Sequence, residues 1–361
     1  MFLMPTLSGG GAERVTVTLL EHLDRSRFES HLALVDAVGP LLKDLPADIP
    51  LHDLKAGRVR RAFPGIIRLV WKLKPQVIHS AMVELNLATV LLRPLFPPWV
   101  RVLIREDTLP SALNAQGRKH PLIWNWLYRW LYPRADKIIC VGDHVLNDLA
   151  DTFAIPHSKL VRIYNPVDLD LARRLSEEGG NPYCGEGPHL VAAGRLAKEK
   201  GFDVLLDAMP MVGVANPNAD LTILGEGPLK PDLLAQREAL GLAGAVNVPG
   251  FQPNPYPYFK HADLFVLPSR WEGFGLVAIE ALAVRTPVVA TDCPGAVREI
   301  LAGCPLAQLV RPSDPQALAG AIIAALKSAQ SGLRPRQSLD AFLSRFDVTT
   351  VLREYEELLG A

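Results

Sequence analysis

The chain has 361 residues, 49% of them hydrophobic, and its 38 Lys+Arg balance 38 Asp+Glu. The length exceeds that of one hydrophobic core and predicts two domains, while the balanced charge argues against a nucleic-acid partner. The four cysteines stand far apart, so a Cys-based zinc cluster and a dense disulfide framework are excluded and a reducing, cytoplasmic setting is favoured.

Short β-type runs alternate with longer helical patterns in the first half of the chain. The runs lie at residues 2–4, 31–35, 77–80, 101–104 and 137–141. This alternation predicts parallel βα units with helices on both faces of the sheet. The apolar stretch 87–104 is interrupted by Arg93 and Pro94, so we do not expect it to cross a membrane.

The segment 164–168 contains an Asn-Pro step, which favours an extended turn and disfavours a helix. It predicts a linker between two domains that face each other across a cleft. After the linker the β-type runs return, at residues 189–193, 220–224, 246–248, 264–267 and 288–291. The sequence therefore predicts two doubly wound sheets.

The first candidate site follows the opening strand, where residues 7–14 are Leu-Ser-Gly-Gly-Gly-Ala-Glu-Arg. Glycines such as Gly10 and Gly11 let backbone N–H groups approach an anion, and a helix N-terminus adds partial positive charge. The segment therefore predicts a phosphate-binding turn. It lacks the full dinucleotide spacing and the Lys-Ser/Thr of a triphosphate loop, so a tight turn without a ligand is an equal alternative.

The second candidate site lies at residues 193–201, again where a strand is followed by a turn and a helix. Arg195 and Lys200 would converge from the two sides of that turn, and a leaving diphosphate requires such cations. The alternative is that both are solvated surface residues. Lys198, between them, is expected to be a bystander.

The third candidate site is the segment 269–282, in which Glu272 and Glu280 are separated by seven residues. Glu272 precedes a helix that begins near Gly275, whereas Glu280 lies about one and a half turns inside it. The two carboxylates therefore need not share one role. The N–H groups at the helix start are expected to receive an anion, and Glu280 could hold two ribose hydroxyls unless it is only a surface residue of the helix.

The order of these motifs resembles that of the retaining glycosyltransferases of family four. The shared motifs are Gly-Arg-x4-Lys-Gly at 194–201, Leu-Gly-Glu-Gly-Pro at 224–228, Pro-Gly-Phe at 249–251, Pro-Ser with the paired glutamates from 268, Thr-Pro-Val-Val-Ala-Thr-Asp at 286–292 and Pro-Gly at 294–295. The resemblance covers essentially the entire chain. It implies the α/β architecture called GT-B, in which two Rossmann-like domains with doubly wound parallel sheets face each other across a cleft.

The resemblance also implies the domain organisation. Residues 1–166 would form the acceptor-side domain and residues 167–345 the domain that binds the nucleotide sugar. Residues 346–361, which contain a helical pattern from 348 to 359, would cross back to the N-terminal domain.

Carried over residue by residue, the resemblance implies a site for a nucleotide-sugar donor. Arg195 and Lys200 would bind the diphosphate and offset charge on the leaving nucleotide, while Glu280 would hold the ribose. Glu272 would contact the donor sugar, and Phe251 would flank the nucleobase. The remaining binding positions would be Gly10 and Gly11, which would face the diphosphate across the cleft, and Gly273, Phe274, Gly275 and Leu276, which would hold sugar and phosphate through the backbone.

The family resemblance implies a mechanism as well. The anomeric configuration would be retained by front-face attack, with the diphosphate acting as the base and without a covalent intermediate, a metal or another cofactor. Electrostatic stabilisation would supply most of the catalysis. Arg195, Lys200 and Glu272 are therefore candidate catalytic residues.

Two positions depart from the family pattern. Many relatives have a histidine in or near the place of Asp107, where it contacts the donor sugar. Asp107 is the fourth candidate catalytic residue because its carboxylate could accept a hydrogen bond from a sugar hydroxyl, with a capping or turn role as an equal alternative. Gly142 stands where relatives often carry serine, and no functional conclusion follows from it.

Aromatic and basic residues are interleaved in the segment 118–134, which suits a helix at a membrane interface. Together with Lys55, Arg58, Arg60 and Arg61 it would rest on anionic lipid at the inner face of the cytoplasmic membrane. The alternative is that the aromatic stripe packs on the N-terminal sheet, as the corresponding helix does in relatives.

The acceptor and the donor base are inferred from the family alone. Relatives with a Gly-Gly-Ala-Glu-Arg start resemble enzymes that build lipopolysaccharide core or polyprenyl-linked oligosaccharides, which implies a glycan or lipid-linked acceptor. UDP is preferred over GDP by family frequency. Other hypotheses are a nucleotide-sugar epimerase or phosphorylase of the same architecture, or a nucleotide-sugar-binding scaffold without catalysis.

Overall fold

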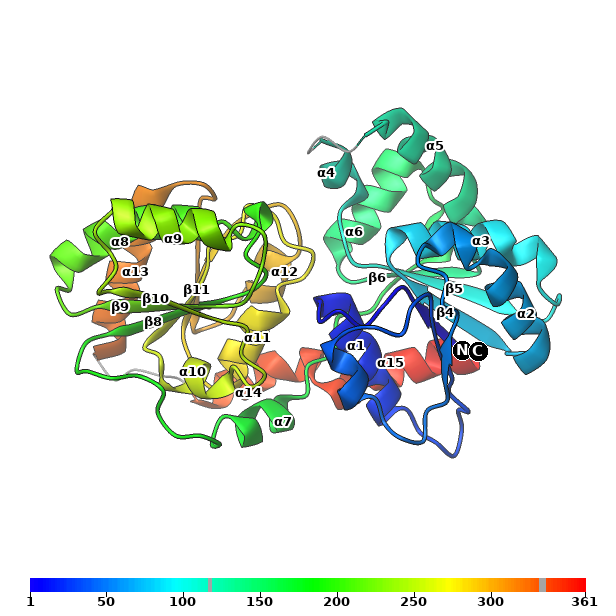
Figure 1. The fold of residues 1–361 in the computed structure, drawn as a ribbon, viewed down its shortest axis with the longest axis horizontal. Coiled ribbons are helices and arrows are strands. Elements are labelled where there is room, and N and C mark those ends of the chain that lie inside the picture. Colours follow the sequence, from blue (N-terminus) through cyan, green and yellow to red (C-terminus); the bar gives the residue numbers. More distant parts are fainter. Residues whose placement is uncertain (116–118, 331–335) are drawn as a thin grey trace. The chain divides into compact units, whose positions relative to one another are not determined.

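The computed structural model describes residues 1–115, 119–330 and 336–361. The chain forms two units: unit 1 contains Met1–Val167 and Val348–Ala361, and unit 2 contains Asp168–Asp347. The expected boundaries after residues 166 and 345 lie beside these. Each unit is a parallel sheet with helices on both faces (Figure 1).

Unit 1 contains a seven-stranded sheet in the order β3-β2-β1-β4-β5-β6-β7. Its interior strands are almost entirely buried, as parallel strands covered on both faces must be, and most of their residues are apolar. The strands are β1 (Phe2–Met4), β2 (Leu32–Leu34), β3 (Leu51–Asp53), β4 (Val77–Ala81), β5 (Arg101–Glu106), β6 (Lys137–Cys140) and β7 (Leu160–Arg162).

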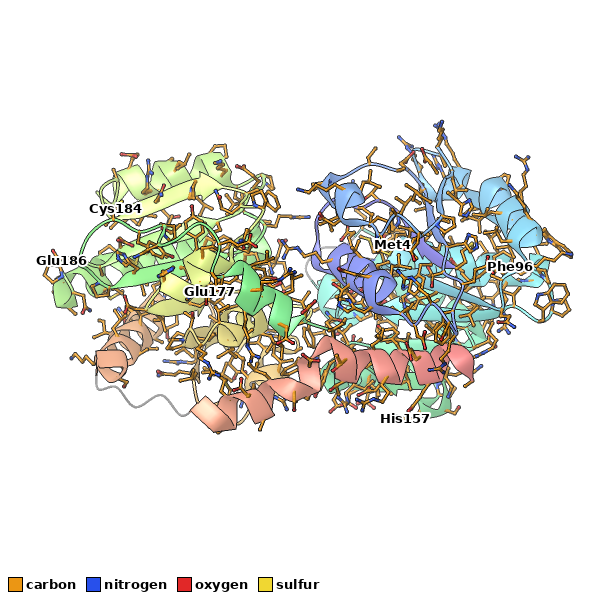
Figure 2. All side chains as sticks on the ribbon, turned by 90° about the horizontal axis from the view of Figure 1, so that it is seen from below. Met4, Phe96, His157, Glu177, Cys184 and Glu186 are labelled. Atoms are coloured by element: carbon orange, nitrogen blue, oxygen red, sulfur yellow. The ribbon has the colours of Figure 1, made fainter. Side chains whose placement is uncertain are left out.

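The helices of unit 1 cover both faces of this sheet (Figure 1). They are α1 (Gly11–His22), α2 (Phe63–Leu73), α3 (Val83–Leu92), α4 (Pro110–Ala115), α5 (Pro121–Leu131), α6 (Asp143–Asn147) and α15 (Val348–Gly360). Helices α2, α3 and α5 lie on one face, and α1 packs with α15 on the other. Figure 2 shows α15, in red, lying along unit 1, and its residue Tyr355 is fully buried there.

Unit 2 contains a six-stranded sheet in the order β10-β9-β8-β11-β12-β13. Adjacent strands pair in parallel; for example, Val191 of β8 lies opposite Thr222 of β9. The strands are β8 (His189–Ala193), β9 (Asp220–Leu224), β10 (Val246–Gly250), β11 (Leu264–Leu267), β12 (Val288–Thr291) and β13 (Ala307–Val310).

The helices of unit 2 are again divided between the two faces. They are α7 (Leu169–Leu175), α8 (Phe202–Ala215), α9 (Lys230–Ala239), α10 (Tyr256–His261), α11 (Leu276–Ala283), α12 (Val297–Leu301), α13 (Pro315–Gln330) and α14 (Arg336–Leu343). Helices α8, α9 and α13 cover one face, where Leu206, Ile223 and Ile322 are fully buried in one apolar cluster. Each such side chain contributes about 1.5–3 kcal/mol when it leaves water.

The strands predicted from sequence are present with small differences in their ends. The structure adds three strands that the sequence did not predict, β3, β7 and β13, and each of them is the last strand at an edge of its sheet. Their side chains are partly exposed, so no continuous apolar run marks them. The predicted linker is extended, and Asp168 at its end caps α7 by accepting a hydrogen bond from the N–H of Leu171 at 2.8 Å.

Candidate active site

The loops that contain the candidate residues of unit 2 follow the carboxyl ends of its strands. Residues 194–201 follow β8, and residues 268–275 follow β11. These strands are neighbours in the centre of the sheet, and the strand order reverses between them. In an open α/β sheet the crevice at such a point is where ligands bind.

Lys200 and Glu272, predicted from separate motifs, form one ion pair in the structure. Lys200 Nζ donates to Glu272 Oε2 at 2.6 Å, and Ser269 Oγ donates to the same oxygen at 3.1 Å. Their side chains are 17% and 11% exposed, so the pair is largely desolvated but still reachable. An anion arriving here would meet a cation that is already held in place.

The two loops are fixed to each other by Arg270. Its backbone N–H donates to the carbonyl of Glu199 at 2.7 Å, and its guanidinium holds both carboxylate oxygens of Asp203 at 2.6 Å. Burial acts to raise the pKa of Asp203, but the hydrogen bonds and charge of Arg270 outweigh it and lower the pKa below its usual value. The two loops that contain Lys200 and Glu272 are therefore held together by hydrogen bonds of Arg270.

Arg195 differs from Lys200 in exposure. Its side chain is 70% exposed, and its Nε lies 3.6 Å from Glu199 Oε1. Such a surface pair contributes little to stability. Arg195 is thus a solvent-exposed cation, whereas Lys200 is held in its ion pair. Lys198, in the turn between them, is exposed.

The start of α11 has the geometry expected for an anion-receptive turn. Gly275 precedes the helix with φ 93°, a left-handed conformation that favours glycine. Glu272 forms an isolated parallel bridge with Gly295, where an added Cβ would lie 1.7 Å from the Glu272 carbonyl oxygen. Gly273 and Leu276 are half-buried, and the Phe274 ring packs on Phe346 with centroids 5.9 Å apart.

Glu280 is not the surface residue of the alternative prediction, because it is only 6% exposed. The hydroxyl of Tyr256 donates to its Oε1 at 3.3 Å. Phe251, after β10, keeps 47% of its surface exposed. The Glu280 carboxylate could accept hydrogen bonds from two vicinal hydroxyls. The exposed ring of Phe251 offers a surface on which a base could stack.

The other candidate residues lie in unit 1. Gly10 precedes α1 and Gly11 is its first residue. Glu13, which the sequence analysis did not single out, turns back to this point: an added Cβ at Gly10 would lie 2.5 Å from Glu13 Oε2. Burial raises the pKa of Glu13, while the N–H groups of Glu13 and Gly10 act to lower it. Its position three residues after Gly10 is the capping-box spacing, a signal present in the sequence.

Asp107 lies at the end of β5 beside a fully buried guanidinium. Arg105 Nη2 lies 2.5 Å from Asp107 Oδ1 and donates to Asn165 Oδ1 at 2.7 Å. Arg105 is 0% exposed, and burial raises the pKa of Asp107 although the charge of Arg105 acts to lower it. The Asp107 carboxylate also acts on Glu13, whose pKa it helps to raise. Asp107 therefore belongs to a buried charged cluster.

Glu106, the neighbouring residue, is a second carboxyl group that the sequence analysis missed. Tyr132 and Thr108 donate hydroxyl hydrogen bonds to it at 2.5 and 2.7 Å. Burial raises its pKa to about 7 despite these hydrogen bonds. No short motif joins Glu106 to Tyr132, so only the fold could reveal the pair.

Within residues 1–115, 119–330 and 336–361, no three His, Cys, Asp or Glu side chains converge as metal ligands. Within the same residues, no helix combines the length and apolar character that crossing a bilayer requires.

Comparisons with known proteins show the family of the chain. A family model described as "Glycosyltransferase Family 4" matches residues 9–171, and one described as "Glycosyl transferases group 1" matches residues 187–328. The N-acetylgalactosamine-N,N'-diacetylbacillosaminyl-diphospho-undecaprenol 4-alpha-N-acetylgalactosaminyltransferase of Campylobacter jejuni is 30% identical over 315 residues, which cover 82% of this chain and 81% of that protein. The lipopolysaccharide core biosynthesis mannosyltransferase LpcC of Rhizobium leguminosarum is 32% identical over 237 residues, 62% of this chain and 63% of that protein.

The fold has close counterparts among solved structures. The crystal structure of HepE from Anabaena in complex with UDP and glucose superimposes with a TM-score of 0.80 at 19% identity, covering all of this chain and 98% of that one. Two Rossmann-like units with these sheet orders define a protein of the GT-B class. The chain belongs to glycosyltransferase family 4, and it is a glycosyltransferase.

Proposed function

We propose that this enzyme transfers a sugar, with retention of anomeric configuration, from a nucleoside-diphosphate sugar to a glycan or lipid-linked acceptor. We further propose that it acts in the assembly of lipopolysaccharide or another cell-surface polysaccharide. The observation that carries the proposal is the braced Lys200–Glu272 pair in the loops after β8 and β11. The acceptors named for the Campylobacter and Rhizobium relatives support the acceptor class.

The proposed roles follow from the chemistry of the side chains. Lys200 and the more exposed Arg195 bind the diphosphate and neutralise the charge that develops as the nucleotide leaves. Glu272 shares Lys200 with the diphosphate and accepts hydrogen bonds from the donor sugar. The backbone of residues 273–276 holds sugar and phosphate, and Glu280 binds the ribose hydroxyls.

Unit 1 supplies the remaining proposed contacts. Gly10 and Gly11 bring backbone N–H groups to the diphosphate, and Asp107 accepts a hydrogen bond from a sugar hydroxyl. No cofactor takes part. UDP is the proposed donor nucleotide, which the UDP bound in the Anabaena structure supports.

The test is a transfer assay with UDP-, GDP-, ADP- and dTDP-sugars on polyprenyl-diphosphate-linked and lipopolysaccharide-core acceptors. We expect one UDP-sugar to be consumed, the product to keep the donor's anomeric configuration by NMR, and the rate to be unchanged by EDTA. An inverted product would contradict the retaining mechanism, and a rate abolished by EDTA would contradict metal independence. Hydrolysis or epimerisation without transfer would contradict the proposed reaction.

A peripheral membrane surface on unit 1 is the second part of the proposal. The face of α5 away from the sheet exposes Leu122, Ile123, Trp126 and Trp130, and the last two rings stack with centroids 5.1 Å apart. Tyr128 and Leu131 of the same helix are buried. The buried face of the helix fits the alternative in which it packs on the sheet, and the exposed face is the one that we propose meets lipid; Arg118 lies outside the described residues.

The charge of the chain segment that contains α5 fits an anionic lipid surface. Residues 54–135 contain 14 Lys+Arg and three Asp+Glu. Two of the three acids, Glu106 and Asp107, and one of the bases, Arg105, are the buried groups at the end of β5. Lys55, Arg58, Arg60 and Arg61 are all exposed. Exposed aromatics inserted at the headgroup level and basic residues facing anionic lipid are the two contributions that hold a protein at a bilayer surface.

Vesicle flotation tests this surface. We expect binding to vesicles that contain phosphatidylglycerol, loss of binding in high salt, and weaker binding after Trp126→Ser with Trp130→Ser. The control is Val214→Ser, which changes an 86% exposed side chain in unit 2. Equal binding of the double variant and the control would contradict the surface.

A further inference from the structure

A charged pair lies against Gly250, the residue before the exposed Phe251. Lys230 Nζ donates to Glu226 Oε1 at 2.6 Å, and the two side chains are 30% and 54% exposed. An added Cβ at Gly250 would lie 2.5 Å from Glu226 Oε1 and 3.4 Å from Lys230 Nζ. The pair therefore lies at the end of β10, where the next residue of the chain is Phe251.

The backbone around the pair is fixed. The N–H of Gly225 donates to the carbonyl of Gly250 at 2.9 Å, which joins the loop after β9 to the end of β10. The N–H of Leu196 donates to the carbonyl of Glu226 at 2.9 Å, so the same loop is also held by the segment after β8. Glu226 and Lys230 therefore project from a rigid base next to the loop that contains Arg195.

Stability does not account for this pair. An exposed ion pair between residues four apart contributes at most a few tenths of a kcal/mol. Lys230 is also the first residue of α9, where a positive charge opposes the helix macrodipole. A lysine at that position costs stability, so a ligand is the better explanation for it.

We propose that Glu226 and Lys230 recognise the keto–imino edge of a uracil that stacks on Phe251; this rests on the proposed nucleotide-sugar donor. The Lys230 ammonium donates to the keto oxygen at uracil position 4, and the Glu226 carboxylate accepts the neighbouring N3–H. Cytosine has the same ring size but presents an amino donor and an unprotonated N3 there. With Lys230 facing position 4 and Glu226 facing N3, both of these groups oppose the pair, so a site in this register selects UDP over CDP.

In this arrangement the contribution of stacking on Phe251 can be measured separately from recognition of the base edge by Glu226 and Lys230. Base–aromatic stacking tolerates any base because each has a π-face. Loss of the Phe251 ring therefore weakens both nucleotides alike, whereas loss of either charged group acts on the difference between them. A site that hydrogen-bonds a ligand group rejects the analogue that lacks it, because its own polar groups are left unpaired.

The experiment measures dissociation constants of UDP and CDP by calorimetry for the full chain and four variants. In the wild type we expect UDP to bind at least about tenfold more tightly than CDP. Lys230→Met and Glu226→Gln are each expected to bring that ratio close to one, and Phe251→Leu to weaken both nucleotides with the ratio kept. The control is Lys260→Met, which breaks a similar surface pair with Glu177 at the end of α7 (Figure 2) and should leave both constants unchanged.

The outcomes distinguish this inference from the function on which it rests. A wild type that prefers UDP while Lys230→Met and Glu226→Gln keep the ratio would overturn the inference and leave the nucleotide-sugar donor standing. A wild type that binds neither UDP nor CDP would overturn the inference and the proposal of UDP as donor nucleotide, while loss of transfer from all four nucleotide sugars would overturn the proposed function itself. Thermal unfolding of each variant verifies folding, and because the readout is a ratio, a general loss of active protein does not change it.

Discussion

The two units differ in the exposure of their cations. In unit 1 the cation beside Asp107 is Arg105, which is 0% exposed, and Glu13 nearby is 6% exposed. In unit 2 the cations stand in surface loops, with Arg195 70% and Lys200 17% exposed. Unit 2 is thus suited to receive an anionic ligand from solvent, whereas unit 1 holds carboxyl groups whose protonation depends on burial.

The difference has a structural cause in the loops. In unit 2 glycines let the backbones after β11 and β12 approach closely, as Gly295 does against Glu272, and Arg270 then fixes the loops from outside. In unit 1 Arg105 pairs with Asp107, and its charge also acts on the pKa of Glu13. The comparison predicts that substitutions in unit 2 change catalysis most, while those in unit 1 change stability and its pH dependence.

The largest expected effect is on turnover, from Lys200→Met. This change removes the fixed cation beside Glu272, and removing one preorganised group that stabilises transition-state charge costs about 100- to 1000-fold in kcat. Initial rates at saturating donor measure it. Lys198→Met, which removes an exposed cation two residues away, is the matched control and should keep nearly full activity. Similar losses in both variants would mean that only general charge matters.

The next effect concerns Glu106 and the pH dependence of stability. Its folded-state pKa of about 7 lies above the ordinary 4.5, mainly because of burial, so the folded chain binds more protons than the unfolded chain between these values. Stability is therefore full below about pH 4.5 and falls as pH rises towards 7, by about 3 kcal/mol. Glu106→Gln should flatten this part of the curve.

Urea unfolding of the full chain at pH 5 and pH 7.5 measures the change in the free energy of unfolding. The control is Glu186→Gln, an exposed carboxyl of unit 2, which should keep the wild-type dependence. If Glu106→Gln loses as much stability between the two pH values as the wild type, the pKa of Glu106 is the same in the folded and unfolded chain. The contrast between the two units would then be weaker.

The sequence predicts interior strands with more accurate bounds than edge strands, because burial leaves a continuous apolar run; the predicted run for the edge strand β10 covers only residues 246–248. β8, β9, β11 and β12 lie inside the sheet, apart from its edges, and the predicted runs match their bounds. The edge strand β3 alternates exposed and half-exposed side chains. Its pairing with β2 is decided by backbone hydrogen bonds, which no residue pattern reports.

The candidate site divides in the same way. Lys200, Glu272 and Glu280 stand in short motifs with glycines, so the sequence could single them out. The bracing pair Arg270–Asp203 joins residues 67 positions apart and has no local signal. Contacts of this kind follow from the order of strands in the sheet rather than from any motif, so they remain hidden until the fold is known.

The smallest expected effect tests the inward position of Glu13. At Gly10 φ is −75° and ψ is 172°, which alanine adopts without strain, so Gly10→Ala acts only through its Cβ, which displaces the Glu13 carboxylate. Loss of this capping contact should lower the free energy of unfolding by about 1 kcal/mol. Gly11→Ala, one residue later and inside α1, should instead raise it by about 0.5–1 kcal/mol because alanine favours the helix. Urea midpoints measure both. Alanine is also a poorer N-cap residue than glycine, which adds to the loss at Gly10; equal signs for the two variants would place Glu13 elsewhere.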